Sequence, residues 1–398
     1  MPLFTGWLRA PGGHRRPTFR SVPRGFTPVL RRSARALLPP GVHAADRVAD
    51  LPREEWDALT GPGDIFLTCR WLEVVESTAG VPMAYLWTER AGRPVAALAT
   101  ALATTSVPWA LGRPDVVLPK SAEEELPQAA ELLAGLGGDP SERLMPSLVT
   151  GGRHVGGTRL LHAPEATPED LAALVQAAEV LGKEAGARSV CFLYLDEQDT
   201  ALGRVLGARG YRTCVTGWFS ALEVPDGGFP AYLAALPSRK RRVSVAAERR
   251  RIAESGVSVG LEELDSADFP RFAELESQLL AKYAIDITPQ QLLPLLHQTR
   301  ECFGGDALAA VARAEGEVVG FATVLRHRDH WTARQTGYDY AYQRRTGLPL
   351  YFELLYYVLV EEAAATGIST VNYGLGSTAT KRSRGCTATE QRCHLLTL

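Results

Sequence analysis

The sequence predicts an α/β protein, of the α+β kind, built from two lobes that each combine a mixed, mostly antiparallel sheet with flanking helices. Three observations predict this fold class. Strand-like apolar runs alternate with helix-like stretches from about residue 50 onward. A strand–turn–strand pattern occurs at 83–102 and again at 307–325. A helix followed by a buried strand also occurs twice, and 398 residues are enough for two domains.

The two helix–strand segments begin and end alike. Pro168 opens the first helix and Gly186 ends it, and Pro349 and Gly367 do the same for the second, with 18 residues from Pro to Gly in both. Proline in the first turn and glycine just past the last turn are the expected signals of a helix's two ends. We therefore expect related lobes at 45–222 and 223–398, although two unrelated units that look alike by chance remain the alternative.

Composition and charge exclude several classes of protein. Hydrophobic residues make up 45% of the chain and charged residues 22%, which is typical of a globular protein. With 43 Lys and Arg against 45 Asp and Glu, the chain is not a polycation, so we expect no DNA partner, and any affinity for RNA must come from a local patch. The uncharged run at 94–112 is too polar to cross a membrane, and no transmembrane segment is expected.

The six cysteines are scattered and form no C-x-x-C motif. Without a secretory signal, this pattern predicts reduced thiols in the cytoplasm. His327 and His330 have a spacing found in metal sites, but no further ligands accompany them, so no metal is expected.

Residues 1–44 form a basic segment that we expect to be disordered. It contains eight arginines and recurrent Pro and Gly, and the first acidic residue of the chain is Asp46. Two interpretations remain open: an unstructured extension, and an arm that contacts phosphates.

A second basic segment lies between the expected lobes. Ser238 is a suitable N-cap, and the sequence is compatible with a helix up to Gly256. Seven of the thirteen residues at 239–251 are Arg or Lys. The candidate RNA- or phosphate-binding residues are Arg239, Lys240, Arg241, Arg242, Arg249 and Arg250. A solvated helix face and a docking site for a carrier protein are the alternatives.

Three sets of residues together resemble a known superfamily. They are Trp56 with the run at 64–72, the run at 232–242 with Glu248-Arg-Arg, and the Gly, Tyr, Pro and Lys pattern at 337–385. In this order they are similar to the Gcn5-related N-acyltransferase (GNAT) superfamily in its duplicated form, which contains FemAB-like aminoacyltransferases and BioF2-like acetyltransferase domains. The resemblance covers about 50–398 and implies an enzyme that forms amides by transferring an acyl group to an amine.

The resemblance also implies where the acyl donor binds. In this superfamily the donor lies beside a strand that splays from its neighbour, and its phosphates lie at the start of the following helix. The matching donor-binding residues here are Arg344, Arg345, Thr346 and Gly347. Free backbone N–H groups at a helix start suit an anion, but Pro349 lacks an N–H, which weakens the match to a coenzyme A loop. An ordinary helix start with solvated arginines is the alternative.

The resemblance places Lys381 in the donor site, where a fixed cation would stabilise the oxyanion of the tetrahedral intermediate. Nearby, Arg384 is suited to hold a carboxylate or a phosphate with two hydrogen bonds. A flexible basic surface loop is the alternative for this segment.

Three further residues complete the candidate catalytic set. Asp339 is expected to orient or deprotonate the amine, and Tyr338 to protonate a leaving group, although alternation along a strand puts the two on opposite faces. Glu353 lies in an otherwise apolar helix and would be costly to bury alone, so we expect it to pair with an arginine, in a structural or a catalytic role.

Three donors are compatible with this chemistry: acyl-CoA, an acyl carrier protein and aminoacyl-tRNA. The basic segment at 1–44, the basic helix and the imperfect coenzyme A loop favour aminoacyl-tRNA as cosubstrate, with a small-molecule or peptide amine as acceptor and no permanently bound cofactor. The sequence has no long heptad arm of the kind that FemAB-type enzymes use for tRNA, which argues against a peptidoglycan role. A catalytically silent binding module that kept the fold remains the alternative from another class.

Overall fold

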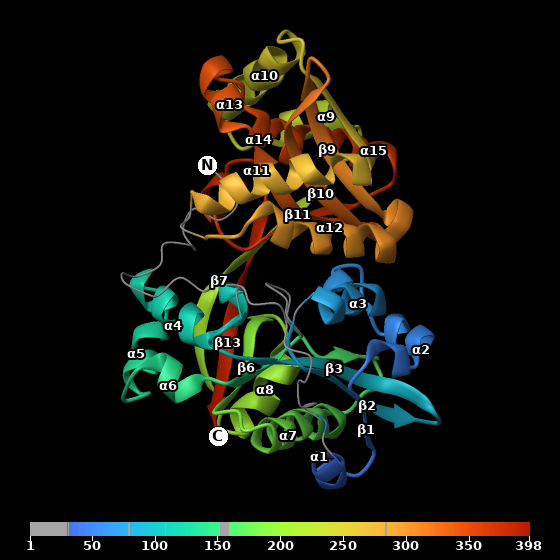
Figure 1. The fold of residues 1–398 in the computed structure, drawn as a ribbon, viewed down its shortest axis with the longest axis vertical. Coiled ribbons are helices and arrows are strands. Elements are labelled where there is room, and N and C mark those ends of the chain that lie inside the picture. The colour runs from blue at the N-terminus through green and yellow to red at the C-terminus, as the bar shows by residue number, and fades with distance from the viewer. Residues whose placement is uncertain (1–29, 31, 79, 108, 152–158, 283–284) are drawn as a thin grey trace. The chain divides into compact units, whose positions relative to one another are not determined.

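The computed structural model describes residues 30, 32–78, 80–107, 109–151, 159–282 and 285–398 (Figure 1). They form two compact units, each a mixed sheet with flanking helices, as the sequence predicts. The N-terminal unit runs to Trp218 and includes Thr389–Leu398, and the C-terminal unit is Phe219–Ala388. The last ten residues thus group with the first half of the chain, whereas the spans drawn from the sequence place them in the second lobe.

The N-terminal unit is built on a sheet with the strand order β1-β2-β3-β4-β6-β13-β7. Neighbouring strands are antiparallel in the pairs β1–β2, β2–β3, β3–β4 and β6–β13, and parallel in β4–β6. The expected hairpin at 83–102 is β2–β3, and the short β5 pairs with β3. The strands are β1 Val42–Ala45, β2 Met83–Arg90, β3 Arg93–Ala103, β4 Ser147–Thr150, β5 Leu161–His162, β6 Ser189–Asp196, β7 Arg212–Glu223 and β13 Thr387–Thr397.

Helix α7 (Pro168–Glu184) packs its apolar face on this sheet, where Leu174 and Leu181 meet Val190 and Phe192. Thr167 and Asp170 form a capping box at its start, and so the expected helix at 168–186 is confirmed. The other helices of the unit are α1 Arg32–Leu37, α2 Arg53–Ala58, α3 Cys69–Thr78, α4 Pro114–Glu123, α5 Ala129–Ala134, α6 Pro140–Leu144 and α8 Thr200–Ala208, with 3₁₀ turns at Val48–Asp50, Ile65–Leu67 and Ala110–Gly112.

Part of the segment expected to be a disordered tail is folded. Leu30 and Ala34 are buried in the core of the N-terminal unit, and β1 begins at Val42 and pairs with β2. Prolines and arginines dominate the composition of this segment, but its few apolar residues are spaced to reach the core. Residues 1–29 and 31 lie outside the described residues.

The C-terminal unit repeats this plan, with the strand order β7-β12-β11-β10-β9-β8. The β9–β10 hairpin is the one expected at 307–325, β11 follows it antiparallel, and β12 then pairs parallel with β11. The β9–β8 and β12–β7 pairs are antiparallel. The strands are β8 Ser258–Glu263, β9 Ala307–Ala314, β10 Glu317–His327, β11 His330–Tyr338 and β12 Thr370–Gly374.

One long helix crosses the C-terminal unit between β11 and β12. It consists of α14 (Leu350–Phe352), a π-helical turn (Glu353–Tyr357) and α15 (Val358–Ala365), and Gly367, with φ +72°, ends it. This is the helix expected at 349–367, and its apolar side chains form the core with β10, β11 and β12. The other helices are α9 Gly228–Ala235, α10 Arg239–Ala253, α11 Phe269–Ala281, α12 Pro289–Phe303, α13 Tyr340–Thr346 and α16 Thr378–Arg382, with 3₁₀ turns at Ser266–Asp268 and Gly304–Asp306.

Helix α11 lies in close contact with β11. A Cβ atom at Gly337 would lie 2.5 Å from the carbonyl carbon of Leu275 and 2.6 Å from the backbone nitrogen of Glu276. Only glycine allows the two backbones to approach this closely. The stacked rings of Phe272 and Phe321, with centroids 4.2 Å apart, also fix α11 on the sheet.

Candidate active site

Strands β11 and β12 separate after a short parallel contact. Their register joins His330 to Thr370 and ends with Thr332 opposite Asn372, while β11 continues to Tyr338. On its other edge β11 pairs with β10 from His330 to Tyr338. One extra residue on β11 between Ala333 and Thr336 makes a β-bulge in this pairing. This is the splayed strand that the resemblance leads us to expect beside the donor.

Lys381 holds the end of β12 on the other side of the splay. Its Nζ donates hydrogen bonds of 2.8 Å to the carbonyl oxygens of Tyr373, Gly374 and Leu375, and the residue is fully buried. Gly374 and Gly376 have φ values of +66° and +77°, which bend the chain so that the three carbonyls converge.

Burial lowers the pKa of Lys381 to about 7. Three carbonyl acceptors nevertheless require all three N–H groups of an ammonium, so the geometry holds the protonated form. Backbone carbonyls thus accept hydrogen bonds from all three N–H groups of Lys381. The side chain therefore fixes the end of β12 and does not face open space.

Arg384 follows α16 and is almost completely buried. Its Nη2 donates to Oε1 and Oε2 of Glu248 at 3.1 and 2.9 Å, and its guanidinium lies 3.7 Å from the centroid of the Phe352 ring. Glu248 also accepts hydrogen bonds from the hydroxyls of Ser244 and Tyr357. Among the described residues, Nε and Nη1 of Arg384 have no hydrogen-bond partner, so three N–H groups of a buried cation are left over.

Glu353 pairs with an arginine, as the sequence predicts for a carboxylate in an apolar helix. Its Oε1 is 3.6 Å from Nε of Arg249, whose guanidinium also lies 4.1 Å from the Phe229 ring centroid and binds Glu361. Burial raises the pKa of Glu353 to about 7, and Arg249 opposes this. Glu353 begins the π-helical turn, a feature that is frequent at functional sites.

Tyr338 and Asp339 are not brought together in one pocket. Tyr338 is buried in the core, where its hydroxyl accepts a hydrogen bond of 2.7 Å from Thr336. Asp339 caps α13 by accepting from the Tyr342 N–H at 2.8 Å and pairs with Arg271 at 2.9 Å. Partial burial opposes its ionisation, but these partners lower the pKa of Asp339, which makes it a weak base.

The segment expected to be a phosphate loop is the end of a helix. Arg344, Arg345 and Thr346 form the last turn of α13, and Gly347 is its C-cap with φ +65°. The Gly347 N–H donates to the Gln343 carbonyl, and the Leu348 N–H approaches the Thr346 hydroxyl at 3.4 Å. A helix C-terminus presents carbonyl groups rather than free N–H groups, but α14 begins at Leu350, three residues after Gly347, so the expected donor-binding role of this segment stays a prediction. The tyrosines and arginines after Asp339 continue as a helix because Asp339 is a good N-cap.

Comparisons with known proteins identify the family to which this chain belongs. A model of the FemAB-like family, described as peptidoglycan biosynthesis/recognition, matches residues 153–397, which is more than half of the chain. The chain belongs to the FemAB-like family. The resemblance inferred from the sequence is thereby confirmed, and this FemAB-like chain is an acyltransferase.

Among solved structures, FemX is 12% identical with a TM-score of 0.59, over 88% of this chain and 96% of FemX. A conserved protein of unknown function from Bacteroides thetaiotaomicron is 11% identical with a TM-score of 0.51, over 89% and 99% of the two chains. A tandem GNAT protein from the clavulanic acid biosynthesis pathway is 15% identical with a TM-score of 0.48, over 89% and 98%. At these sequence identities the structures show that the fold is similar and no more. A search of curated proteins found no match.

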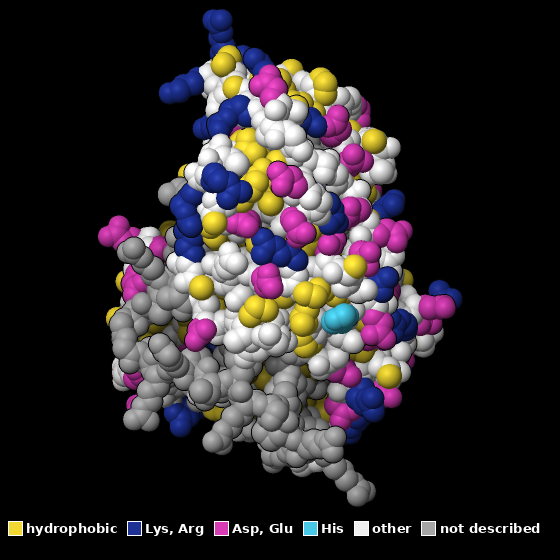
Figure 2. Space-filling model, turned by 45° about the horizontal axis from the view of Figure 1, so that its top comes forward, with side chains coloured by type: hydrophobic (Ala, Val, Ile, Leu, Met, Phe, Trp, Pro, Cys, Tyr) yellow, Lys and Arg dark blue, Asp and Glu magenta, His cyan; other side chains and the backbone are white. Residues whose placement is uncertain are grey.

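The FemAB-like chain carries its basic residues on the surface of α10 and on the last turn of α13. Hydrogen bonding of the Arg251 guanidinium to the Gly347 carbonyl, at 2.8 Å, joins the two helices. In Figure 2, Lys and Arg side chains gather at the upper end of the view, where Figure 1 places α10 and α13. We call this surface the basic face; its exposed members are Arg239, Lys240, Arg250, Arg251, Arg344 and Arg345.

Not every candidate of the basic helix belongs to this face. Arg241 and Arg242 are half-buried, and Arg242 donates to the Leu236 carbonyl at 2.8 Å. Arg249 is turned inward to Glu353. Helix α10 therefore has two sides. One side exposes charged side chains to solvent, and the other packs against the long helix, where Arg249 pairs with Glu353.

Several residues of the site were not predicted from the sequence. Glu248 is the lone acidic residue among the seven basic ones at 239–251, and that contrast was the available signal. Tyr357 gives no signal of its own, since it looks like one more apolar core position of its helix. Glu276 and Gln335, which meet at 2.7 Å beside the bulge, lie 59 residues apart in the sequence, so only the fold brings them together.

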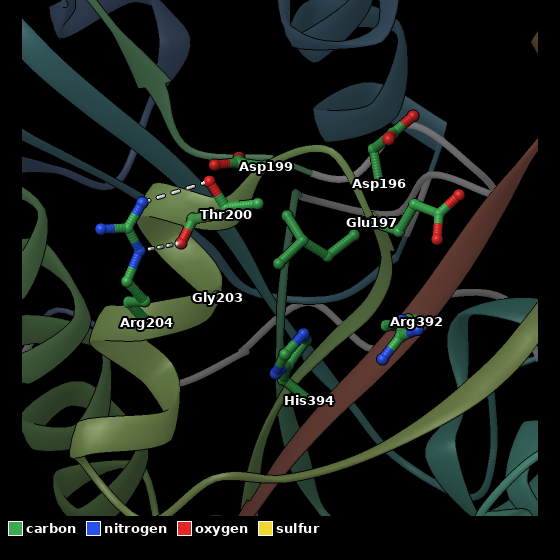
Figure 3. Close-up of a pocket in the computed structure, with 9 residues that line it drawn as sticks. Asp196, Glu197, Asp199, Thr200, Gly203, Arg204, Arg392 and His394 are labelled. Carbon is green, nitrogen blue, oxygen red and sulfur yellow. Dashed lines mark hydrogen bonds between the residues drawn. The ribbon is translucent and has the colours of Figure 1, made fainter.

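A separate pocket of about 380 Å³ lies in the N-terminal unit, between the end of β6, the start of α8 and β13 (Figure 3). Figure 3 shows His394 on β13 facing α8 across the pocket, with the Arg204 guanidinium bonded to Thr200. Burial lowers the pKa of His394 to about 4, so its ring is neutral at physiological pH. None of the residues predicted from the sequence lines this pocket.

Two further findings bear on the kind of site. In the part of the chain that the structure describes, no three His, Cys, Asp or Glu side chains are grouped so that they would hold a metal ion. Over the same residues, no helix combines the length and apolar character needed to cross a membrane.

Proposed function

We propose that this FemAB-like chain forms an amide by transferring an aminoacyl group from aminoacyl-tRNA to the amine of a small molecule or a peptide precursor. The observation that carries the proposal is the basic face. It places six exposed cations on two helices of the unit that also contains the splayed strand.

The basic face suits an extended polyanion better than a single small ligand. Lys and Arg side chains that neutralise phosphates release counterions and so supply affinity that does not depend on base sequence. A protein distinguishes RNA mainly by its backbone shape and by its single-stranded ends, and the charged 3′ end of tRNA is such an end.

The end of α13 argues against coenzyme A as the donor. A pyrophosphate is commonly held by backbone N–H groups at the start of a helix. Here the N–H of Gly347 bonds the Gln343 carbonyl, and Pro349, the N-cap of the following helix α14, has no N–H. Acyl-CoA or an acyl carrier protein remains the alternative donor, and it would have to bind by other groups.

In the proposed reaction the ester carbonyl of the donor lies beside β11 where it leaves β12. The lone pair of the amine forms a C–N bond to the carbonyl carbon, the negative charge moves to the carbonyl oxygen, and the ester C–O bond breaks as the intermediate collapses. We assign Lys381 a positioning role, because it fixes the three carbonyls that end β12. Two guanidinium nitrogens of Arg384 have no hydrogen-bond partner among the described residues, and so this side chain is suited to an anion.

A peptide acceptor is supported by the family, whose model is described as peptidoglycan biosynthesis/recognition. A cytoplasmic location remains a prediction from the cysteines.

The experiment supplies the full chain with radiolabelled aminoacyl-tRNA or with acetyl-CoA, and follows amide formation on a panel of amines and stem peptides. Product from aminoacyl-tRNA supports the proposal. Product from acetyl-CoA alone would show that the donor is an acyl-CoA, and no product from either donor would contradict the proposal.

A further inference from the structure

Glu276 is a carboxylate that no part of the proposed function has used. It lies on α11, and its Oε2 accepts a hydrogen bond of 2.7 Å from Nε2 of Gln335. Among the described residues, no hydrogen bond to its other oxygen, Oε1, is found. One oxygen is thus fixed and the other is left to accept a proton.

The position of Glu276 is set by the strand that splays. Gln335 lies in the bulge of β11, beyond Thr332, which is the last residue paired with β12. The bulge turns the Gln335 N–H to the Thr323 hydroxyl at 2.8 Å, and this fixes the strand on the β10 side. The absence of a side chain at Gly337 lets α11 pack closely on β11 beside Glu276, where a Cβ atom would lie 2.6 Å from the Glu276 nitrogen.

Amide formation needs a base at this place. An amine enters as an ammonium ion, and it must lose a proton before its lone pair can attack. The other carboxylates of the site are poorly suited, because each is paired with an arginine: Asp339 with Arg271, Glu248 with Arg384 and Glu353 with Arg249.

We propose that Glu276 is the general base that deprotonates the acceptor amine. This inference rests on the proposed function, because it takes the donor carbonyl to lie beside the splayed part of β11. The Glu276 carboxylate accepts one proton from the ammonium, and the neutral amine then forms the C–N bond. When the ester C–O bond breaks, the leaving oxygen takes the second proton from nitrogen, and Glu276 returns its proton to solvent.

The electrostatics of the position agree with this role. Burial raises the pKa of Glu276 to about 7, while the Gln335 hydrogen bond and the charge of Arg334 oppose the rise. Arg334 of β11 is the charged group that acts on this carboxyl, and among the described residues of β10 and α12 no ionisable group contributes. A base with a pKa near the working pH is the most effective proton acceptor.

The test compares Glu276→Gln, Glu276→Asp and Glu276→Ala with the wild-type chain, and uses Glu301→Gln as a control that removes an exposed carboxylate from α12. With whichever donor the wild type accepts, we expect Glu276→Gln to lower kcat on the order of 10²-fold and to abolish the acidic limb of the pH profile of kcat/KM. Added formate should restore part of the activity of Glu276→Ala, which a structural role would not allow. A kcat for Glu276→Gln within threefold of wild type, with an unchanged pH profile, would overturn the assignment and leave the proposed function intact.

A second measurement does not depend on activity. Carboxyl groups of ¹³C-labelled glutamate are titrated by NMR in the wild type and in Glu276→Gln, and the missing signal identifies Glu276. We expect it to titrate near pH 7, and titration near pH 4 would overturn the assignment even if no donor were accepted.

Discussion

Arg384 and Glu248 form a buried ion pair between two segments 136 residues apart, with Nη2 of the arginine 2.9 Å from Oε2 of the glutamate. The pair ties α10, which carries the basic face, to the segment that follows Lys381. Because Tyr357 also donates to Glu248, the long helix belongs to the same network. The surface proposed for the donor and the end of β12 are therefore mechanically connected.

Removal of one partner of this pair should destabilise the protein more than removal of both. Arg384→Met leaves the Glu248 carboxylate without its cation, and we expect a loss of about 3 kcal/mol in the free energy of unfolding. Urea unfolding of Arg384→Met, Glu248→Gln and the double variant gives the coupling energy, with Glu254→Gln on the exposed end of α10 as control. Additive effects in the double variant would show that the two residues are not coupled.

Lys381→Met should damage the protein although it keeps the length of the side chain. The three carbonyl oxygens of 373–375 would lose their donor in a buried place, and each unsatisfied buried group costs about 1 kcal/mol or more. We expect a loss of about 3 kcal/mol in unfolding free energy, and a slower transfer reaction because the end of β12 is released. Lys183→Met, in the exposed last turn of α7, is the control; an equal, small effect of both variants would show that the hydrogen bonds of Lys381 contribute little.

Gly337→Ala tests the contact of α11 with β11. The added methyl group would lie 2.5 Å from the Leu275 carbonyl carbon of α11, so α11 must shift away from β11. We expect a loss of about 1–3 kcal/mol in stability, together with reduced transfer, because Glu276 moves with the helix. Gly260→Ala on β8, where no atom lies within 4 Å of the new Cβ, should change neither quantity.

Glu353 should make stability depend on pH. Its pKa is raised from 4.5 to about 7, so the folded chain binds the proton more tightly than the unfolded chain does. The folded state is therefore favoured below pH 4.5, and this contribution is lost as the pH rises to about 7, by an amount on the order of 3 kcal/mol. We expect the stability of wild type relative to Glu353→Gln to fall over this range in urea titrations, and a constant difference between pH 4 and 8 would contradict the assignment.

The elements that the sequence predicts well are those with local signals. Both hairpins, the helices that begin at Pro168 and Pro349, and the Ser238 cap of α10 depend on residues close together in the chain. The grouping of Thr389–Leu398 with the N-terminal unit is not predictable in this way, because the pairing of β13 with β6 joins residues about 200 positions apart in the chain.

The roles of the candidate site residues stay predictions, and the contacts that these residues make were not predictable from the sequence. Lys381 and Arg384 are buried although basic residues near a glycine suggest a surface loop. Asp339 was expected beside the amine, but a strand that ends at Tyr338 makes it a helix cap. Such outcomes depend on which carbonyls and carboxylates the fold places nearby, and the local sequence does not contain that information.

The central claim is that the basic face of α10 and α13 presents aminoacyl-tRNA to the splayed strand. The most direct measurement is the rate of amide formation from aminoacyl-tRNA at several salt concentrations, in wild type and in the triple variant Arg239→Gln, Lys240→Gln and Arg250→Gln. The control removes three exposed cations elsewhere, at Arg93, Lys183 and Arg328. We predict that RNase treatment of the donor abolishes the reaction. We also predict that the triple variant, but not its control, raises KM for the donor. In that variant the plot of log affinity against log salt concentration should become shallower by about one unit of slope for each phosphate that is no longer neutralised. Amide formation that survives RNase, or an equal effect of the triple variant and its control, would contradict the account.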